Sequence, residues 1–457
     1  MDAGSIPSDK AILPTIARWV VSEKTTLHFI CKPAGITALP MVTTTSSEQG
    51  KDRNAIYFPG LNALRYFAAA AVVVCHVEEM KGISLYTNWY ATVYGLGTLA
   101  VTFFFVLSGF LITYLLLVEK EKINTVRIKN FYIRRALRIW PLYYLIGALG
   151  LLVIPHISSL AIPEFSAKVI PAYPTNIALY ALFLPNIAAG LKYYVPYASH
   201  LWSVGVEEQF YLFWPWIFKY VKKPLPVIIS VIVAFVLMRV CCSYALAHWP
   251  ERQVELSMLY KILDLTRIDC MAVGGVGAYM VFRDFSWFRA YFINYKAELA
   301  SLIIPLVLIA TSTKLGDIQH TVYSFCFLIF IINVSCGSKS FFRLEGKVWT
   351  FLGNISYSIY MYQYLAIGIV MVLFKKANAL SFTMPYNIAF HLLSQVLVII
   401  LAQLSYRFLE TPFLKLKKKF MVVQSTTNSP DAGYTPLAAN ALSDAATLAK
   451  ASNATGG

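Results

Sequence analysis

The stretch LNALRYFAAAAVVVCHVEEM, residues 61–80, determines how the chain is organised, because it predicts a membrane-spanning helix with two ionisable side chains. Arg65 and His76 are eleven residues apart, so an α-helix places both side chains on one face, about 16 Å apart along its axis. Small residues separate them, which allows a neighbouring helix or a ligand to approach closely. Ionisable residues inside a span usually belong to a functional site. The alternative is that Arg65 snorkels to the headgroups and His76 faces the membrane surface.

The composition is that of a helical membrane protein. Hydrophobic residues make up 58% of the 457 residues and charged residues only 14%, whereas soluble domains are usually about a quarter charged. The net charge of +16 does not indicate a nucleic-acid partner, because the cations flank apolar runs as the positive-inside rule predicts. The seven cysteines have no spacing typical of a metal or redox site, so no metal is expected.

The apolar runs predict an all-α, polytopic transmembrane protein with about ten spans. They fall at about residues 61–80, 94–118, 139–154, 209–220, 227–246, 263–281, 299–311, 322–336, 351–374 and 388–408. The basic stretch 119–138 is assigned to a cytoplasmic loop, which places both termini in the cytoplasm, Arg65 at the inner end of its span and His76 at the outer end. Residues 177–189 are also apolar, but a span there would break this orientation, so they predict a re-entrant or interfacial helix on the outer side.

Three regions follow from this organisation. Residues 1–56 lack a convincing span and the core of a signal peptide, and we expect a cytoplasmic extension with Met41 as an alternative start. Residues 57–413 form the membrane domain. Residues 414–457 predict a basic segment followed by a disordered cytoplasmic tail rich in Ala, Ser and Thr.

On the predicted inner side, arginines gather in the run FYIRRALRIWPLYY. Arg135 and Arg138 are three residues apart, so they share a helix face. Two guanidiniums there suit a ligand that carries phosphates, and Arg65 reaches the same surface. The alternative is that these arginines only anchor the span in the membrane.

On the predicted outer side, the run HLWSVGVEEQFYLFWPW begins at residue 200. Glu207 or Glu208 would orient and charge His76, or act as a base itself. A structural alternative is that both carboxylates favour the start of a helix that Ser203 caps.

Arg267 lies near Asp269 in the run LDLTRIDCMAVGGVGAY, also at a predicted outer end. With Asp264 they form either an internal charge pair, at a spacing of three residues between Asp264 and Arg267, or a polar vestibule that binds a hydroxyl-rich ligand. The glycines that follow, Gly274, Gly275 and Gly277, predict close contact with another helix.

Taken in order, these stretches resemble the acyltransferase 3 family, integral-membrane O-acyltransferases that modify cell-surface glycans and some secondary metabolites. The matching stretches cover about residues 57–413 and are PGLNALRYFAAAAVVVCH, FFFVLSGFLIT, FYIRRALRIWPLYY, HLWSVGVEEQFYLFWP, TRIDCMAVGGVGAY, LGNISYSIYMYQ and YRFLETPF. The family's Arg-x10-His, Arg-x-x-Arg and Trp-Ser-x-x-x-Glu-Glu patterns fall on Arg65 and His76, Arg135 and Arg138, and Trp202, Ser203, Glu207 and Glu208. Many members have His where this chain has Gln363.

The resemblance implies an O-acyltransferase of a bacterial cytoplasmic membrane. Acyl-CoA, in the first place acetyl-CoA, would be the donor on the cytoplasmic side, and a hydroxyl of a glycan or glycoside the acceptor on the outer side. No cofactor would be bound permanently. The residues implied are His76, Glu207 and Glu208 for catalysis, Arg65, Arg135 and Arg138 for the CoA phosphates, and Trp202, Ser203, Arg267 and Asp269 for the acceptor.

Transport is the competing class of function. In a secondary transporter of an organic anion or a lipid-linked sugar, the inner arginines would bind the anion and His76 would relay protons. A non-catalytic membrane partner is a weaker alternative, because polar residues are predicted at both membrane faces.

Overall fold

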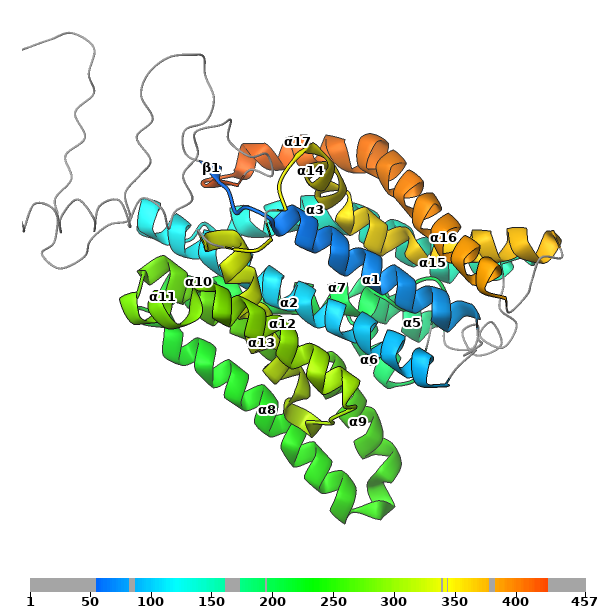
Figure 1. Cartoon of the computed structure of the whole chain (residues 1–457), viewed down its shortest axis with the longest axis horizontal. Helices are drawn as coiled ribbons and strands as arrows, with labels where there is room; N and C mark the ends of the chain where they lie inside the picture. Colours follow the sequence, from blue (N-terminus) through cyan, green and yellow to red (C-terminus); the bar gives the residue numbers. More distant parts are fainter. Residues whose placement is uncertain are drawn as a thin grey trace, which may run out of the picture. The chain divides into compact units, whose positions relative to one another are not determined.

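The computed structural model describes residues 55–81, 87–160, 173–193, 195–337, 340–342, 344–377 and 383–425. The predicted N-terminal extension, with Met41, lies outside these residues except for its last two. The described chain is almost entirely helical, which confirms the predicted all-α class. Its long helices lie side by side, with α1 packed against α2 and α15 (Figure 1).

The first half of the described chain contains β1 (Ala55–Ile56), α1 (Leu61–Lys81), α2 (Thr87–Ile123), α3 (Ile128–Ala148), η1 (Leu149–Val153), η2 (Ile154–His156), α5 (Tyr173–Ala181), α6 (Pro185–Gly190), α7 (Leu201–Tyr220), α8 (Pro224–His248), η3 (Pro250–Arg252), α9 (Gln253–Leu265) and α10 (Ile268–Arg283). The second half contains α11 (Ser286–Phe292), α12 (Tyr295–Ala310), η4 (Gly316–Ile318), α13 (Gln319–Cys336), α14 (Lys347–Asn354), α15 (Ser356–Lys376), α16 (Met384–Ser405), η5 (Tyr406–Glu410), α17 (Thr411–Lys417), η6 (Lys418–Phe420) and β2 (Gln424–Ser425).

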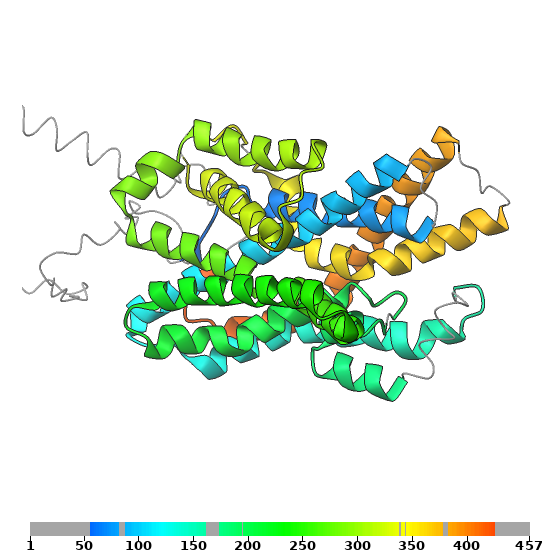
Figure 2. The ribbon, with the colours of Figure 1, turned by 90° about the horizontal axis from the view of Figure 1, so that it is seen from below.

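Eight helices of the described chain are long and apolar enough to cross a membrane, and the bent pair α11–α12 would make nine. The 20-residue helix α7 is not among them and carries Glu207, Glu208 and Lys219. The α2 span is 72% buried inside the molecule, whereas the α8 span is 22% buried. α8 accordingly lies along the lower side of the bundle in Figure 1 and at the front in Figure 2, with apolar side chains such as Leu237 exposed as they would be to lipid.

The basic stretch predicted to be a loop is helical instead. α2 continues to Ile123 and α3 begins at Ile128, so only residues 124–127 connect them. Lys, Glu and Arg are good helix formers, which allows both helices to continue beyond their apolar runs. With 37 residues, α2 is about 55 Å long, well above the roughly 30 Å of a bilayer's apolar core. Arg135 and Arg138 therefore lie within α3 and not in a loop.

Two other predicted segments have a clear outcome. Residues 177–189 fall in two short helices, α5 and α6, and neither is long enough to cross a membrane. The predicted basic segment after residue 413 is helical: α17 and η6 pack against α3, and the Arg134 side chain donates a hydrogen bond to the carbonyl of Phe420. β2 then pairs in parallel with β1, so both ends of the described chain lie on one side of the bundle.

Glycines bring α2 and α10 into backbone contact at the centre of the bundle. A methyl group added at Gly109 would overlap the carbonyl of Met271, and one added at Gly274 would overlap the carbonyl of Val106. This confirms the close helix contact predicted for the glycines of α10. Because lipid is as apolar as the helix interior, such packing is a main source of stability in a membrane protein.

Candidate active site

The structure brings the three predicted arginines together at one end of α1. Arg65 on α1 lies within electrostatic range of Arg135 and Arg138 on α3, and all three side chains are partly exposed. The described part of the chain offers neither Arg65 nor Arg138 a hydrogen bond or an ion pair. We call Arg65, Arg135 and Arg138 the arginine cluster.

Two buried polar atoms beside this cluster have no partner among the described residues, Nε of Arg135 and Oε1 of Glu208. The Arg135 guanidinium lies over the rings of Phe131 and Tyr211, 5.6 and 5.8 Å from their centroids. Oε2 of Glu208 accepts a hydrogen bond of 3.3 Å from Trp140. A buried polar atom without a partner costs about 1–3 kcal/mol, so the cluster is suited to a polar ligand that contributes the missing bonds.

Glu207 and Glu208 belong to this end of the bundle, which corrects the prediction that one of them orients His76. The Tyr211 hydroxyl donates a 3.0 Å hydrogen bond to Glu207, and the charged neighbours of that carboxylate are the three arginines of the cluster. α7 begins at Leu201, eight residues earlier than predicted. Each of its residues therefore lies about 12 Å farther along the helix than expected.

His76 is held by α15 at the other end of α1. Its Nδ1 lies 2.9 Å from Oε1 of Gln363, and the amide nitrogen of Gln363 donates to the carbonyl of Tyr360 at 2.8 Å. Because that second bond fixes the amide, its oxygen faces the imidazole, and the neutral ring must carry its proton on Nδ1. The lone pair is then on Nε2, and the side chain is 16% exposed.

The carboxylate that accompanies His76 is Glu79, three residues later on the same helix. Its Oε2 lies 3.7 Å from Nε2 of His76 and accepts a 2.9 Å hydrogen bond from the hydroxyl of Tyr364. The Tyr364 ring stacks on the imidazole with centroids 4.4 Å apart. The sequence analysis missed this residue, although its spacing of three from His76 on a helix was a usable signal.

A second histidine, His200, lies beside this site. Its ring centroid is 5.2 Å from that of Tyr364. Nε2 donates to the carbonyl of Met361 at 3.1 Å, which leaves Nδ1 buried without a partner in the described chain. Burial lowers the pKa of His200 to about 3, so the ring is neutral at physiological pH. We call His76, His200, Gln363 and Tyr364 the histidine cluster.

Ser203 and Arg267, both predicted to bind the acceptor, have different neighbours. Ser203 shares a 2.6 Å hydrogen bond with the Tyr360 hydroxyl beside His200. Arg267 is 4% exposed and lies 5.6 Å from the ring centroid of Trp202. Its guanidinium donates to the hydroxyl of Thr102 at 3.1 Å, and its described partners include no carboxylate.

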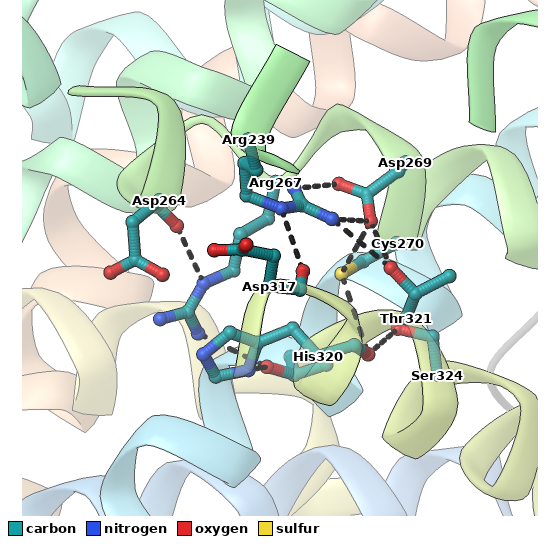
Figure 3. A network of polar contacts seen from close by, with 10 residues as sticks. Arg239, Asp264, Arg267, Asp269, Cys270, Asp317, His320, Thr321 and Ser324 are labelled. Atoms are coloured by element: carbon teal, nitrogen blue, oxygen red, sulfur yellow. Dashed lines mark hydrogen bonds and ion pairs between the residues drawn. The ribbon is translucent and has the colours of Figure 1, made fainter. Parts of the chain in front are cut away.

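Asp269 is fully engaged within the protein, which corrects its predicted contact with a ligand. Both of its oxygens accept hydrogen bonds from Arg239 on α8, at 2.9 and 2.8 Å, and one accepts a further bond from Thr321 at 2.7 Å (Figure 3). The side chain is 0% exposed. Arg267 does turn toward Asp264, three residues earlier, but its Nε donates to the backbone carbonyl of that residue at 3.1 Å and not to its carboxylate (Figure 3).

The two clusters share helix α1, which contributes Arg65 to one and His76 to the other, and they differ in chemistry. One presents guanidiniums without hydrogen-bonded partners, as a polyanion requires. The other presents a neutral imidazole with one free lone pair, as general base catalysis requires. In the described ranges, no group of three or more His, Cys, Asp or Glu side chains is placed to hold a metal ion.

Comparisons with known proteins assign the chain to a family. A family model described as an acyltransferase domain, that of the acyltransferase 3 family, matches residues 58–405. A protein of Staphylococcus aureus strain COL with the name "Putative O-acetyltransferase" is 26% identical over 390 residues, which cover 79% of this chain and 58% of that protein. O-acetyltransferase OatA of S. aureus strain NCTC 8325 is 26% identical over 383 residues, which cover 79% of this chain and 57% of OatA. No solved structure matches.

This chain thus spans less than two thirds of the length of these relatives. The family match nevertheless includes the arginine cluster, His76, His200 and both glutamates of α7. On this match, the chain belongs to the acyltransferase 3 family.

Proposed function

We propose that this chain is a membrane O-acyltransferase that moves an acyl group, in the first place acetyl, from cytoplasmic acyl-CoA to a hydroxyl of a glycan or glycoside on the outer side of a bacterial cytoplasmic membrane. The observation that carries the proposal is the pairing of an arginine cluster with a free imidazole lone pair on one face of α1. The names of the two relatives support acetyl as the group transferred.

The donor binds through its phosphates. Arg65, Arg135 and Arg138 come from two helices, and guanidiniums suit bidentate hydrogen bonds to phosphate oxygens. The distance of about 16 Å between Arg65 and His76 along α1 is comparable to the length of an extended pantetheine arm. Binding at the arginine cluster therefore allows the thioester to reach the histidine cluster while the nucleotide stays at the other end.

His76 acts as the general base. Nε2 takes the proton of the acceptor hydroxyl as its oxygen attacks the thioester carbonyl. The tetrahedral intermediate then expels the CoA thiolate, which recovers the proton from the imidazolium. Glu79 lies 3.7 Å from Nε2 and stabilises the imidazolium between these steps. A positioned general base contributes about 10²–10⁴ in rate.

We infer that the chain crosses the membrane ten times, with both termini in the cytoplasm. The nine candidate spans, counting the bent pair as one, become ten when α7 is included. An even number of crossings is supported by the β1–β2 pairing, which brings both ends of the described chain to one side. The basic ends of α2 and α17 favour the cytoplasm for that side.

Mass spectrometry of surface glycans from cells with and without the gene tests this function. We expect loss of an ester-linked acyl mass, which wild type restores and His76→Ala or Arg135→Ala/Arg138→Ala does not. His248→Ala is the control, because His248 is an exposed histidine on α8. An unchanged acyl content in the gene deletion, or full rescue by His76→Ala at equal protein abundance, would refute the proposal, and loss of solute movement alone would indicate a transporter.

A further inference from the structure

α17, near the C-terminal end of the last candidate span (Met384–Phe420), delivers a lysine to the arginine cluster. α17 packs against α3, and Arg134 holds the end of this segment in place. The Arg134 guanidinium donates to the carbonyl of Phe420 at 2.9 Å and to Glu119 at 3.0 Å. The other oxygen of Glu119 accepts the backbone N–H of Arg127 at 2.9 Å. Arg134 is therefore neutralised, and it positions α17 rather than facing a ligand.

Lys417 occupies an unusual place on α17. Its side chain is partly buried, whereas Lys415, Lys418 and Lys419 are exposed. Its charged neighbours are the guanidiniums of Arg134 and of all three members of the arginine cluster. The described chain offers the Lys417 ammonium no hydrogen bond and no ion pair. A cation held among other cations raises the free energy of the folded state unless an anion joins them.

The carboxylates near the cluster do not balance its charge. Glu207 and Glu208 lie beside the arginines, and Glu410 comes within range of Arg138 while it accepts hydrogen bonds from two serines, Ser358 and Ser405. With Lys417 included, four cations therefore face at most three carboxylates of the described chain. Nε of Arg135 in the cluster and Oε1 of Glu208 beside it are also buried without a partner among the described residues. The site accordingly has both unused positive charge and unused hydrogen-bonding capacity.

We propose that Lys417 is a fourth binding residue for the phosphates of the donor, and that α17 closes the phosphate site from outside the bundle. This inference rests on the proposed function, since it takes acyl-CoA as the ligand. The flat guanidiniums suit bidentate contacts, and the flexible ammonium adds a point charge that can reach a phosphate oxygen they leave free. α17, which lies at the end of the predicted membrane domain, is thus part of the binding site.

The test measures acetyl-CoA affinity of the full chain in nanodiscs of zwitterionic phosphatidylcholine. Lys417→Met keeps the length of the side chain and removes its charge, and Lys417→Arg restores a cation. Lys415→Met and Lys419→Met are matched controls on the exposed side of the same segment. We expect Lys417→Met to lose about 10- to 100-fold in affinity, as loss of one charge-assisted hydrogen bond implies, Lys417→Arg to recover most of it, and both controls to match wild type.

Thermal unfolding without ligand separates binding from a structural role. If Lys417 only held α17 in place, Lys417→Met would unfold at a lower temperature. Because the substitution removes repulsion among like charges, we expect an unchanged or higher unfolding temperature together with weaker binding. Lower stability of Lys417→Met with unchanged affinity would overturn the proposal.

Two further binding experiments identify the ligand. Dephospho-acetyl-CoA lacks the 3′-phosphate, so a defect of Lys417→Met that disappears with this donor assigns the lysine to that phosphate, and one that persists assigns it to the pyrophosphate. Nanodiscs that contain anionic phosphatidylglycerol test a lipid headgroup as the occupant. If Lys417→Met weakens only the competition of this lipid with acetyl-CoA, and leaves acetyl-CoA affinity in phosphatidylcholine unchanged, the assignment to acyl-CoA is wrong.

The outcomes also distinguish this inference from the proposed function. Loss of acetyl-CoA binding in Arg135→Ala/Arg138→Ala with wild-type binding in Lys417→Met would overturn only the role of Lys417. Absence of acetyl-CoA binding by the wild-type chain would overturn both.

Discussion

Replacing Gln363 by Met tests whether the tautomer of His76 controls the reaction. The amide oxygen of Gln363 is the acceptor for Nδ1–H of the imidazole at 2.9 Å. Met is similar in length and offers no comparable acceptor. In the variant, Nδ1–H would be buried without a partner, whereas a proton on Nε2 could bond to Glu79, whose carboxylate lies 3.7 Å from that nitrogen. The proton should therefore move to Nε2 and occupy the lone pair that the reaction requires.

The size of the effect follows from the hydrogen bond that is lost. An unsatisfied buried donor costs about 1–3 kcal/mol, which shifts the tautomer equilibrium by roughly 5- to 150-fold. Because only the ring with a free Nε2 is active, the rate of acyl transfer should fall by up to the same factor. Substrate binding at the arginine cluster should not change, since that cluster lies at the other end of α1.

The assay is ester content of surface glycans in complemented cells, with acetyl-CoA affinity of the purified chain as a parallel measurement. Gln403→Met is the matched control, because Gln403 on α16 also has a buried amide oxygen and has no described contact with His76. Nitrogen-15 NMR of labelled histidine reports the tautomer directly. Wild-type acyl transfer by Gln363→Met at equal abundance, with the His76 proton still on Nδ1, would refute the reasoning.

Three further predictions concern stability. Arg239→Met and Asp269→Leu should each lose about 3–5 kcal/mol, because each leaves a buried charge without its partner; thermal unfolding in detergent should show the double variant Arg239→Met/Asp269→Leu to be less destabilised than either single, and additive losses would contradict the pairing. Burial lowers the pKa of His200 to about 3 against about 6.5 when unfolded, so the unfolded state binds more protons and stability should fall by about 2 kcal/mol from about pH 6.5 to about pH 5; His200→Gln should flatten that part of the unfolding profile, and an unchanged slope would exclude His200 as its cause. Gly109→Ala should abolish the folded yield by size-exclusion chromatography, because its methyl would meet the Met271 backbone, whereas Gly95→Ala, with open space around it, should behave as wild type; equal yields would refute the packing argument.

Several properties of this protein could be predicted from short stretches of sequence, because they depend on periodicity within one helix. The all-helical class follows from long apolar runs with few charges. The common face of Arg65 and His76 follows from a spacing of eleven residues, and that of Arg135 and Arg138 from a spacing of three. The glycines of α10 predicted a close helix contact, and the structure identifies α2 as the partner.

The family resemblance selected candidate residues but did not indicate their neighbours. It associated Glu207 and Glu208 with catalysis, whereas the structure places them beside the arginines. It presented Gln363 as a departure from the family pattern, whereas the structure shows an amide that sets the protonated nitrogen of His76. These differences arise because a motif specifies which residues occur and not how far along the bundle each helix is displaced.

Only the tertiary structure decided which side chains from different helices meet. Asp269 pairs with Arg239, thirty residues away on α8, and not with its near neighbour Arg267. Lys417 reaches the arginines from the C-terminal end of the last candidate span. Helical periodicity fixes the direction of a side chain relative to its own axis. The rotation and offset between helices depend on where small residues let backbones approach, and those contacts join residues far apart in the chain.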